Sequence, residues 1–170
     1  MSLLADDFIT ESPDVEENED KNLSPCDFVC SLAKQKADAV FENNRDSLVI
    51  GSDTIVVLEN RILGKPKDEK DACQMLRNLS GKTHEVYTGV CIECEQESRT
   101  FFCKTDVTFY ELSDEEIENY VFSGEPMDKA GSYGIQGKGA LFVEKINGDY
   151  FNVVGFPVSM IKKELNKFLK

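Results

Sequence analysis

Residues 48–58 decide the fold of this chain and read Leu48-Val49-Ile50-Gly51-Ser52-Asp53-Thr54-Ile55-Val56-Val57-Leu58. Most of the run is apolar and rich in β-branched side chains, a composition that predicts a buried β-strand. A carboxylate in such a strand costs free energy unless a metal ion, a cation or several hydrogen-bond donors meet it. Three roles are open to Asp53: a catalytic or metal-binding carboxylate, the N-cap of a following turn, or the partner of a buried lysine. Capping is disfavoured because the run continues apolar on both sides.

The length and composition predict one domain that spans residues 1–170. A chain of 170 residues with 41% hydrophobic side chains suffices for one packed core but is short for two. The formal net charge of -13 argues against binding to nucleic acid or to an anionic membrane. No apolar run reaches the roughly 18 residues that span a bilayer, and no secretory signal is recognisable. We therefore expect a cytoplasmic protein with reduced cysteines.

Hydrophobic periodicity, capping residues and turn residues predict an α/β domain with a mixed sheet flanked by helices. Helices are expected near residues 25–42 after the cap Ser24, from the cap Asp68 to Ser80-Gly81, from a capping box at Ser113 to Gly124, and after Pro157. Strands are expected at 48–58 with a hairpin turn at Glu59-Asn60, at about 83–94 and 99–110 as an antiparallel pair, and from Ala140 to Ile146.

Four more side chains are candidates for chemistry, each with a structural alternative. Lys65 stands between a glycine and a proline, which would fix its ammonium in one place, or it is a solvated loop lysine. Lys129 enters a glycine-rich segment and either cradles phosphates or lies in water. Gln136 either reads the edge of a base through its paired donor and acceptor or braces a loop. His84, in a strand-like setting, favours a structural role over a hydrolase triad.

The charges of two acidic residues and three lysines suit one reaction. Glu17 and Asp53 together would hold a divalent cation, while Lys36, Lys65 and Lys129 would neutralise a polyphosphate. Asp53 would also deprotonate or align an attacking water. This combination indicates phosphoanhydride hydrolysis.

Five motifs succeed one another along most of the chain: Ser52-Asp53-Thr54, Gly64-Lys65-Pro66, Leu79 to Gly89, Asp128 to Gly137, and Gly148 to Pro157. In this order they resemble the Maf-like nucleoside triphosphate pyrophosphatases. The resemblance implies a two-lobed α/β fold, similar to inosine triphosphate pyrophosphatases, with a nucleotide cleft between the lobes. It also implies cleavage of a nucleoside triphosphate to the monophosphate and pyrophosphate with a divalent metal, Mg²⁺ or Mn²⁺.

The resemblance also implies roles for individual residues. Asp53 would be the proton acceptor, with Glu17, Lys36, Lys65 and Lys129 around the phosphates and the metal. The form Ile135-Gln136-Gly137 is similar to the branch that acts on dTTP and UTP, in which Thr54 and Gln136 help to select the base. The expected partner is a nucleoside triphosphate, a homodimer is an option, and neither nucleic acid nor membrane is expected.

The sequence departs from the family at its beginning. Family members open with a strand and a Ser-x-Ser-Pro-Arg-Arg loop, whereas the start Met1-Ser2-Leu3-Leu4-Ala5-Asp6-Asp7-Phe8 resembles the family segment on the C-terminal side of that loop. Arginines at a phosphate site donate charge-assisted hydrogen bonds, and loss of one transition-state donor costs about 10²- to 10³-fold in rate. We therefore expect an N-terminally truncated form with reduced activity. The alternative is a non-catalytic nucleotide-binding regulator, for example of cell division.

Overall fold

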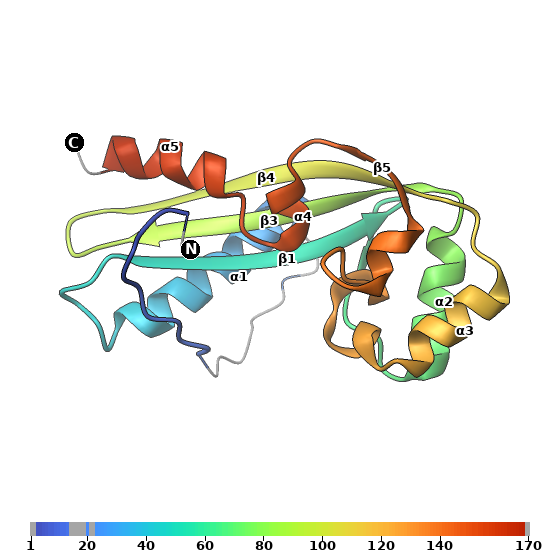
Figure 1. Ribbon diagram of the computed structural model, residues 1–170. Helices are drawn as coiled ribbons and strands as arrows, with labels where there is room; N and C mark the ends of the chain where they lie inside the picture. Colours follow the sequence, from blue (N-terminus) through green and yellow to red (C-terminus); the bar gives the residue numbers. More distant parts are fainter. Residues whose placement is uncertain (1–2, 14–19, 21–22, 169–170) are drawn as a thin grey trace.

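The computed structural model describes residues 3–13, 20 and 23–168 (Figure 1). The predicted metal ligand Glu17 lies outside these residues. Along the chain the elements are α1 (Pro25–Phe41), β1 (Val49–Leu58), β2 (Arg61–Leu63), α2 (Glu69–Leu79), β3 (Thr83–Glu93), β4 (Ser98–Phe109), α3 (Asp114–Phe122), the short 3-10 helices η1 (Glu125–Asp128), η2 (Ala130–Ser132) and η3 (Lys138–Phe142), β5 (Val143–Asn147), α4 (Tyr150–Val154) and α5 (Val158–Phe168).

The strands form one sheet in the order β2-β1-β3-β4-β5, flanked by helices as expected. Every pairing among the described strands is antiparallel, so the prediction of a mixed sheet was wrong. Two of the four pairings follow from their connections, because β1–β2 and β3–β4 are joined by short turns, which link antiparallel strands. In this register Asp53 lies opposite Gly89, and Thr54 lies opposite Thr88.

Among the described strands, one edge of β1 is paired over only part of its length. The short strand β2 pairs with β1 at Val56–Leu58 and nowhere else. Among the described strands, residues 49–55 of β1 are thus paired on the β3 side alone. Asp53 lies within this segment.

The helices pack in two groups, one along the sheet and one at its end. Figure 1 shows α1 along one face of the sheet and α5 along the opposite face, while α2 and α3 lie beyond one end. Ile161 of α5 packs against Val90 and Ile92 of β3, whereas the intervening Cys91 packs toward α1. This alternation is the two-residue period of a strand with both faces buried.

Two glycines let α1 approach the sheet closely. A Cβ atom at Gly51 would lie 2.5 Å from the carbonyl oxygen of Ala33, and one at Gly89 would lie 2.4 Å from that of Val29. Side chains at these positions would push the helix away from β1 and β3. Gly51, two residues before Asp53 in β1, is therefore required for the packing of α1.

Most predicted elements are confirmed, with two differences. The caps Ser24 and Asp68 and the capping box of Ser113 are formed. Residues 140–142 belong to η3, and the strand after it begins at Val143, because the glycine-rich segment turns before it extends. Helix α4 was not predicted; Asp149 caps it by accepting a 2.8 Å hydrogen bond from the Phe151 N–H. None of the described helices has the length and apolar character of a membrane span.

Candidate active site

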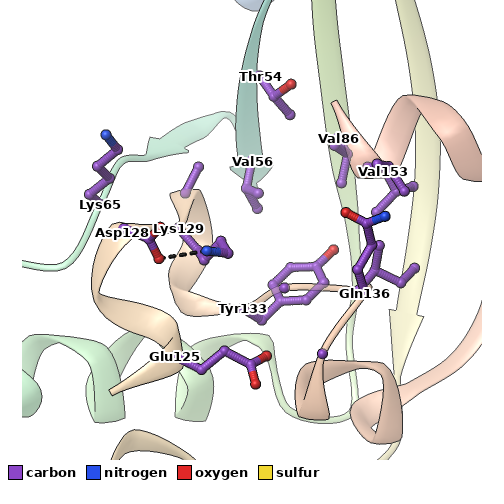
Figure 2. A pocket seen from close by; sticks show the side chains of 15 residues that line it. Thr54, Val56, Lys65, Val86, Glu125, Asp128, Lys129, Tyr133, Gln136 and Val153 are labelled. Carbon is purple, nitrogen blue, oxygen red and sulfur yellow. Dashed lines mark hydrogen bonds and ion pairs between the residues drawn. The ribbon is translucent and has the colours of Figure 1, made fainter. Parts of the chain in front are cut away.

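Figure 2 shows a pocket of about 380 Å³ whose lining includes Thr54 and Val56 of β1. These two side chains alternate with Asp53, which pairs with Lys36 of α1, so they lie on the face of the sheet opposite α1. It is bounded by β1, β3, α4 and the segment from η1 to Gly137. The apolar part of its lining consists of Val56, Val86, Ala130, Tyr133, Ile135, Val153 and Val154. Its volume is that of a small-molecule site, and its apolar walls suit a flat ring such as a nucleobase.

The pocket gathers four residues that are far apart in the sequence: Thr54, Lys65, Lys129 and Gln136. All four were predicted to bind substrate. Figure 2 shows Lys65 and Lys129 on one side of the pocket and Gln136 on the other, with Tyr133 between them. The arrangement separates a cationic end from an end with an amide and apolar walls.

The hydroxyl of Thr54 belongs to a cross-strand chain of hydrogen bonds. Its Oγ1 lies 2.9 Å from Oγ1 of Thr88, which in turn donates to the carbonyl oxygen of Asn152 at 2.8 Å. Thr88 and Asn152 are fully buried. The amide of Asn152 donates to the carbonyl oxygen of Val86 at 3.0 Å and to Oγ1 of Thr105 at 2.9 Å. Asn152 thus fixes α4, and with it Val153 and Val154 of the pocket wall.

Lys129 is held by its neighbour at the pocket. Its ammonium donates to Asp128 at 2.6 Å. This hydrogen bond from Lys129, together with the charges of Lys129 and Lys65, lowers the pKa of the Asp128 carboxyl. The two side chains are 40% and 74% exposed, and an exposed ion pair of this kind contributes only about 0–1 kcal/mol. The Lys129 ammonium is therefore easily redirected to an anionic ligand.

Glu125 fastens the loop that carries Gln136. Its carboxylate accepts hydrogen bonds from the Tyr120 hydroxyl at 3.0 Å and from the backbone N–H groups of Lys138 at 3.1 Å and Gly139 at 3.4 Å. The Tyr120 hydroxyl accepts from the N–H of Gly134 at 3.1 Å. Burial opposes the charge of Glu125, but these hydrogen bonds outweigh burial and lower its pKa. Both ends of the loop are thus tied to one carboxylate–phenol pair.

Asp53 and Lys36 do not line this pocket. They form an ion pair between β1 and α1, with 13% of the Asp53 side chain and 28% of the Lys36 side chain exposed. Asp53 lies in mid-strand, so it is not an N-cap. Of the three roles open to it, two remain: a carboxylate for catalysis or metal binding, and the partner of a lysine. The ion pair is compatible with both.

The predicted metal site is represented here by Asp53 alone, because Glu17 lies outside the described residues. No group of three or more His, Cys, Asp or Glu side chains suited to a metal occurs in the described parts of the chain. The Asp53 carboxylate suits Mg²⁺, which typically takes one or two carboxylates together with substrate phosphates and water.

His84 lies in the core behind the pocket, in keeping with a structural role. Its Nε2 is 2.8 Å from the hydroxyl of Tyr133, and its ring stacks edge-on against Phe109. Burial lowers the pKa of His84 to about 4, so the imidazole is neutral at physiological pH. His84 therefore orients the Tyr133 ring that forms part of the pocket lining.

The comparisons with known proteins identify the family. A family model described as "Maf-like protein" matches residues 1–168. The chain belongs to the Maf family. It is 58% identical over 155 residues to a protein of Bacillus cereus strain B4264 named dTTP/UTP pyrophosphatase, a match that covers 91% of this chain and 81% of the relative. Proteins of the same name from Bacillus cereus strain AH820 and Bacillus thuringiensis subsp. konkukian strain 97-27 are 59% identical over the same shares.

Several pocket residues of this Maf-family chain were not found by sequence reasoning. The loop-fastening Glu125 comes after a helix end and resembles any exposed acidic residue there. Val153 and Val154 belong to a five-residue helix that is too short to show a hydrophobic period. Only Tyr133 among these residues had a recognisable sequence signal, because a large aromatic side chain inside a glycine-rich segment indicates a packing contact.

Proposed function

We propose that this chain hydrolyses dTTP and UTP to the nucleoside monophosphate and pyrophosphate. The observation that carries the proposal is the identity of 58–59% over 91% of the chain to relatives named dTTP/UTP pyrophosphatase. The pocket supports it, because Thr54, Gln136, Lys65 and Lys129 line one cavity with room for a base.

The base would occupy the apolar end of the pocket. Valines from β1, β3 and α4 offer the flat walls that a pyrimidine ring needs. The Gln136 amide presents a donor and an acceptor side by side, as the polar edge of thymine or uracil does. Thr54 would contribute a third polar contact. Selection of the base would thus rest on Thr54 and Gln136.

The phosphates would extend from the cationic end of the pocket. Lys65 and Lys129 provide two ammonium groups there, and Lys129 would exchange its weak pairing with Asp128 for a phosphate oxygen. From this end the polyphosphate would pass the edge of β1 at residues 49–55, where no described strand pairs on the β2 side, and reach Asp53 and Lys36. This path would join the pocket to the ion pair on the opposite face of the strand.

The chemical step would be a displacement at the α-phosphorus. A water oxygen forms the new bond to phosphorus, the bond from phosphorus to the bridging oxygen breaks, and pyrophosphate leaves. Asp53 takes the proton of the water, and Lys36 holds the Asp53 carboxylate in position. The lysines stabilise the charge that develops on the phosphate oxygens.

A divalent cation, Mg²⁺ or Mn²⁺, would be held by Asp53 and Glu17 together with the phosphates. When bound, it supplies positive charge to the polyphosphate and to the leaving group. Mg²⁺ in such sites usually takes one or two carboxylates together with substrate phosphates. A cytoplasmic location and a homodimer remain predictions.

The proposed function is tested by pyrophosphate release from a panel of nucleoside triphosphates, with and without Mg²⁺ or Mn²⁺. We expect metal-dependent release from dTTP and UTP that Asp53→Asn lowers about 10²- to 10⁴-fold. Asp46→Asn, in an exposed turn, should leave the release intact. Nucleotide binding without release would contradict the enzyme and support the regulator. The absence of both binding and release would exclude either function.

A further inference from the structure

In this chain of hydrogen bonds, the hydroxyl of Thr54 acts as the donor to Thr88. Oγ1 of Thr88 lies within hydrogen-bond distance of two oxygens, the Asn152 carbonyl at 2.8 Å and Thr54 Oγ1 at 2.9 Å. A threonine hydroxyl has one hydrogen, and the carbonyl can only accept. Both hydrogen bonds form together only if Thr88 donates to Asn152 and accepts from Thr54. Because Thr88 is fully buried, satisfying both is strongly favoured.

This arrangement fixes what Thr54 offers to a ligand. Its hydrogen points at Thr88, so the oxygen presents only lone pairs toward the pocket that Thr54 lines. Gly155 keeps the oxygen uncovered, since a Cβ there would lie 3.1 Å from Thr54 Oγ1. Thr54 is therefore a hydrogen-bond acceptor of fixed direction, although threonine hydroxyls in general can serve as donor or acceptor.

We propose that Thr88 is a positioning residue for base selection, because it makes Thr54 an acceptor that pairs with the N3–H of thymine or uracil and repels the bare N3 of cytosine. Gln136 cannot make this distinction alone, because its amide can rotate to exchange donor and acceptor. A ligand that leaves polar groups of the site without hydrogen-bond partners is strongly disfavoured relative to one that pairs with them. The inference rests on the proposed function for the identity of the ligand.

The test compares dTTP with 5-methyl-dCTP, which has the shape of dTTP but an amino group at C4 and no hydrogen on N3. The readout is the ratio of kcat/KM for the two nucleotides in the full chain. The unsubstituted protein is expected to prefer dTTP by at least about tenfold. In Thr88→Val the hydroxyl of Thr54 is released and can donate to the bare N3. We expect the ratio to fall about tenfold, with part of the change a gain of activity on 5-methyl-dCTP, which mere structural damage would not give.

Two variants separate this role from a general effect on folding. Thr88→Ser retains the hydroxyl and is expected to keep the preference for dTTP. Thr83→Val is the matched control, because Thr83 and Thr108 form a similar cross-strand hydroxyl pair at 2.8 Å in an exposed part of β3 and β4, outside the pocket lining. Urea denaturation of each variant establishes that it is folded.

The outcomes distinguish this inference from the proposed function. An unchanged ratio in folded Thr88→Val, or no base preference in the unsubstituted protein, would overturn the role of Thr88 while leaving pyrophosphate release intact. If no triphosphate is hydrolysed, the proposed function fails, and the ratio of dissociation constants for non-hydrolysable α,β-methylene analogues of the same two nucleotides decides the role of Thr88. Failure to bind either analogue would overturn both.

Discussion

Asp53 and Thr54 are adjacent on β1 but serve opposite faces of the sheet. The Asp53 carboxylate pairs with Lys36 of α1, whereas the Thr54 hydroxyl pairs with Thr88 and lines the pocket. The alternation of side chains along a strand requires this separation. β1 thus carries a carboxylate for chemistry and a hydroxyl for recognition at neighbouring positions, and the two side chains contact different residues on opposite faces of the sheet.

The separation predicts that a change at Asp53 affects turnover more than base recognition. Asp53→Asn keeps the shape of the side chain but removes the proton acceptor. We expect kcat for dTTP to fall about 10²- to 10⁴-fold, the usual contribution of a general base, while the binding preference for dTTP over 5-methyl-dCTP is retained. Steady-state kinetics and analogue binding measure the two effects. A variant that loses base preference but keeps turnover would contradict this division.

The carboxylate of Glu125 should determine the order of the loop from Gly134 to Gly139. In Glu125→Gln one of the two carboxylate oxygens becomes an N–H₂ group, which cannot accept from the Lys138 or Gly139 amide. We expect hydrogen exchange in this loop to accelerate about tenfold, the equivalent of about one hydrogen bond to a charged group, and KM for dTTP to rise. Exchange mass spectrometry measures the first effect.

The matched control for this loop is Glu144→Gln, an equal change of charge at an exposed position of β5. It should leave exchange in the loop unchanged. Equal exchange rates in Glu125→Gln and the unsubstituted protein would show that the loop is ordered by other contacts.

Among the described asparagines, we expect substitution of Asn152 to lower the free energy of unfolding most. Asn152→Ala removes both donated hydrogen bonds and leaves the buried Val86 carbonyl without this donor. We expect a loss of about 2–3 kcal/mol in the free energy of unfolding, measured by urea denaturation. Asn78→Ala, at an exposed position of α2, should change it by less than about 0.5 kcal/mol. A similar small effect at Asn152 would mean that α4 is held by its apolar contacts alone.

His84 gives the protein a pH-dependent stability. Its pKa is lowered from 6.5 to about 4 by burial, so the unfolded chain binds this proton first as the pH falls. The contribution of the neutral imidazole is complete above pH 6.5 and is lost as the pH drops toward 4. Between about pH 7.5 and 5 the loss is about 2 kcal/mol.

Urea denaturation at several pH values tests this, and the assignment is simple because His84 is the only histidine. His84→Gln should be less stable at neutral pH and should lack most of the slope across the same pH range. A slope that persists in this variant would assign the pH dependence to the carboxylates instead.

The elements of this fold were largely predictable because their signals are local. The cap Ser24, the turn at Glu59-Asn60 and the capping box of Ser113 each depend on residues a few positions apart. Helix α4 and the late start of β5 were missed for the opposite reason. Five residues show no period, and the path of the glycine-rich segment depends on Glu125 and Tyr120, which precede it by several residues.

The sequence by itself determined the membership of this chain in a family, the α/β class and the identity of the candidate residues, because motifs and periodicity are properties of the chain order. Only the tertiary structure decided which of them meet. It placed Thr54, Lys65, Lys129 and Gln136 at one pocket and put Asp53 with Lys36 on the other face of β1. It also gave Thr54 a fixed hydrogen-bond direction through Thr88 and Asn152. Thr88 and Asn152 are 64 positions apart in the chain, and such contacts arise from strand register and packing, which no local pattern records.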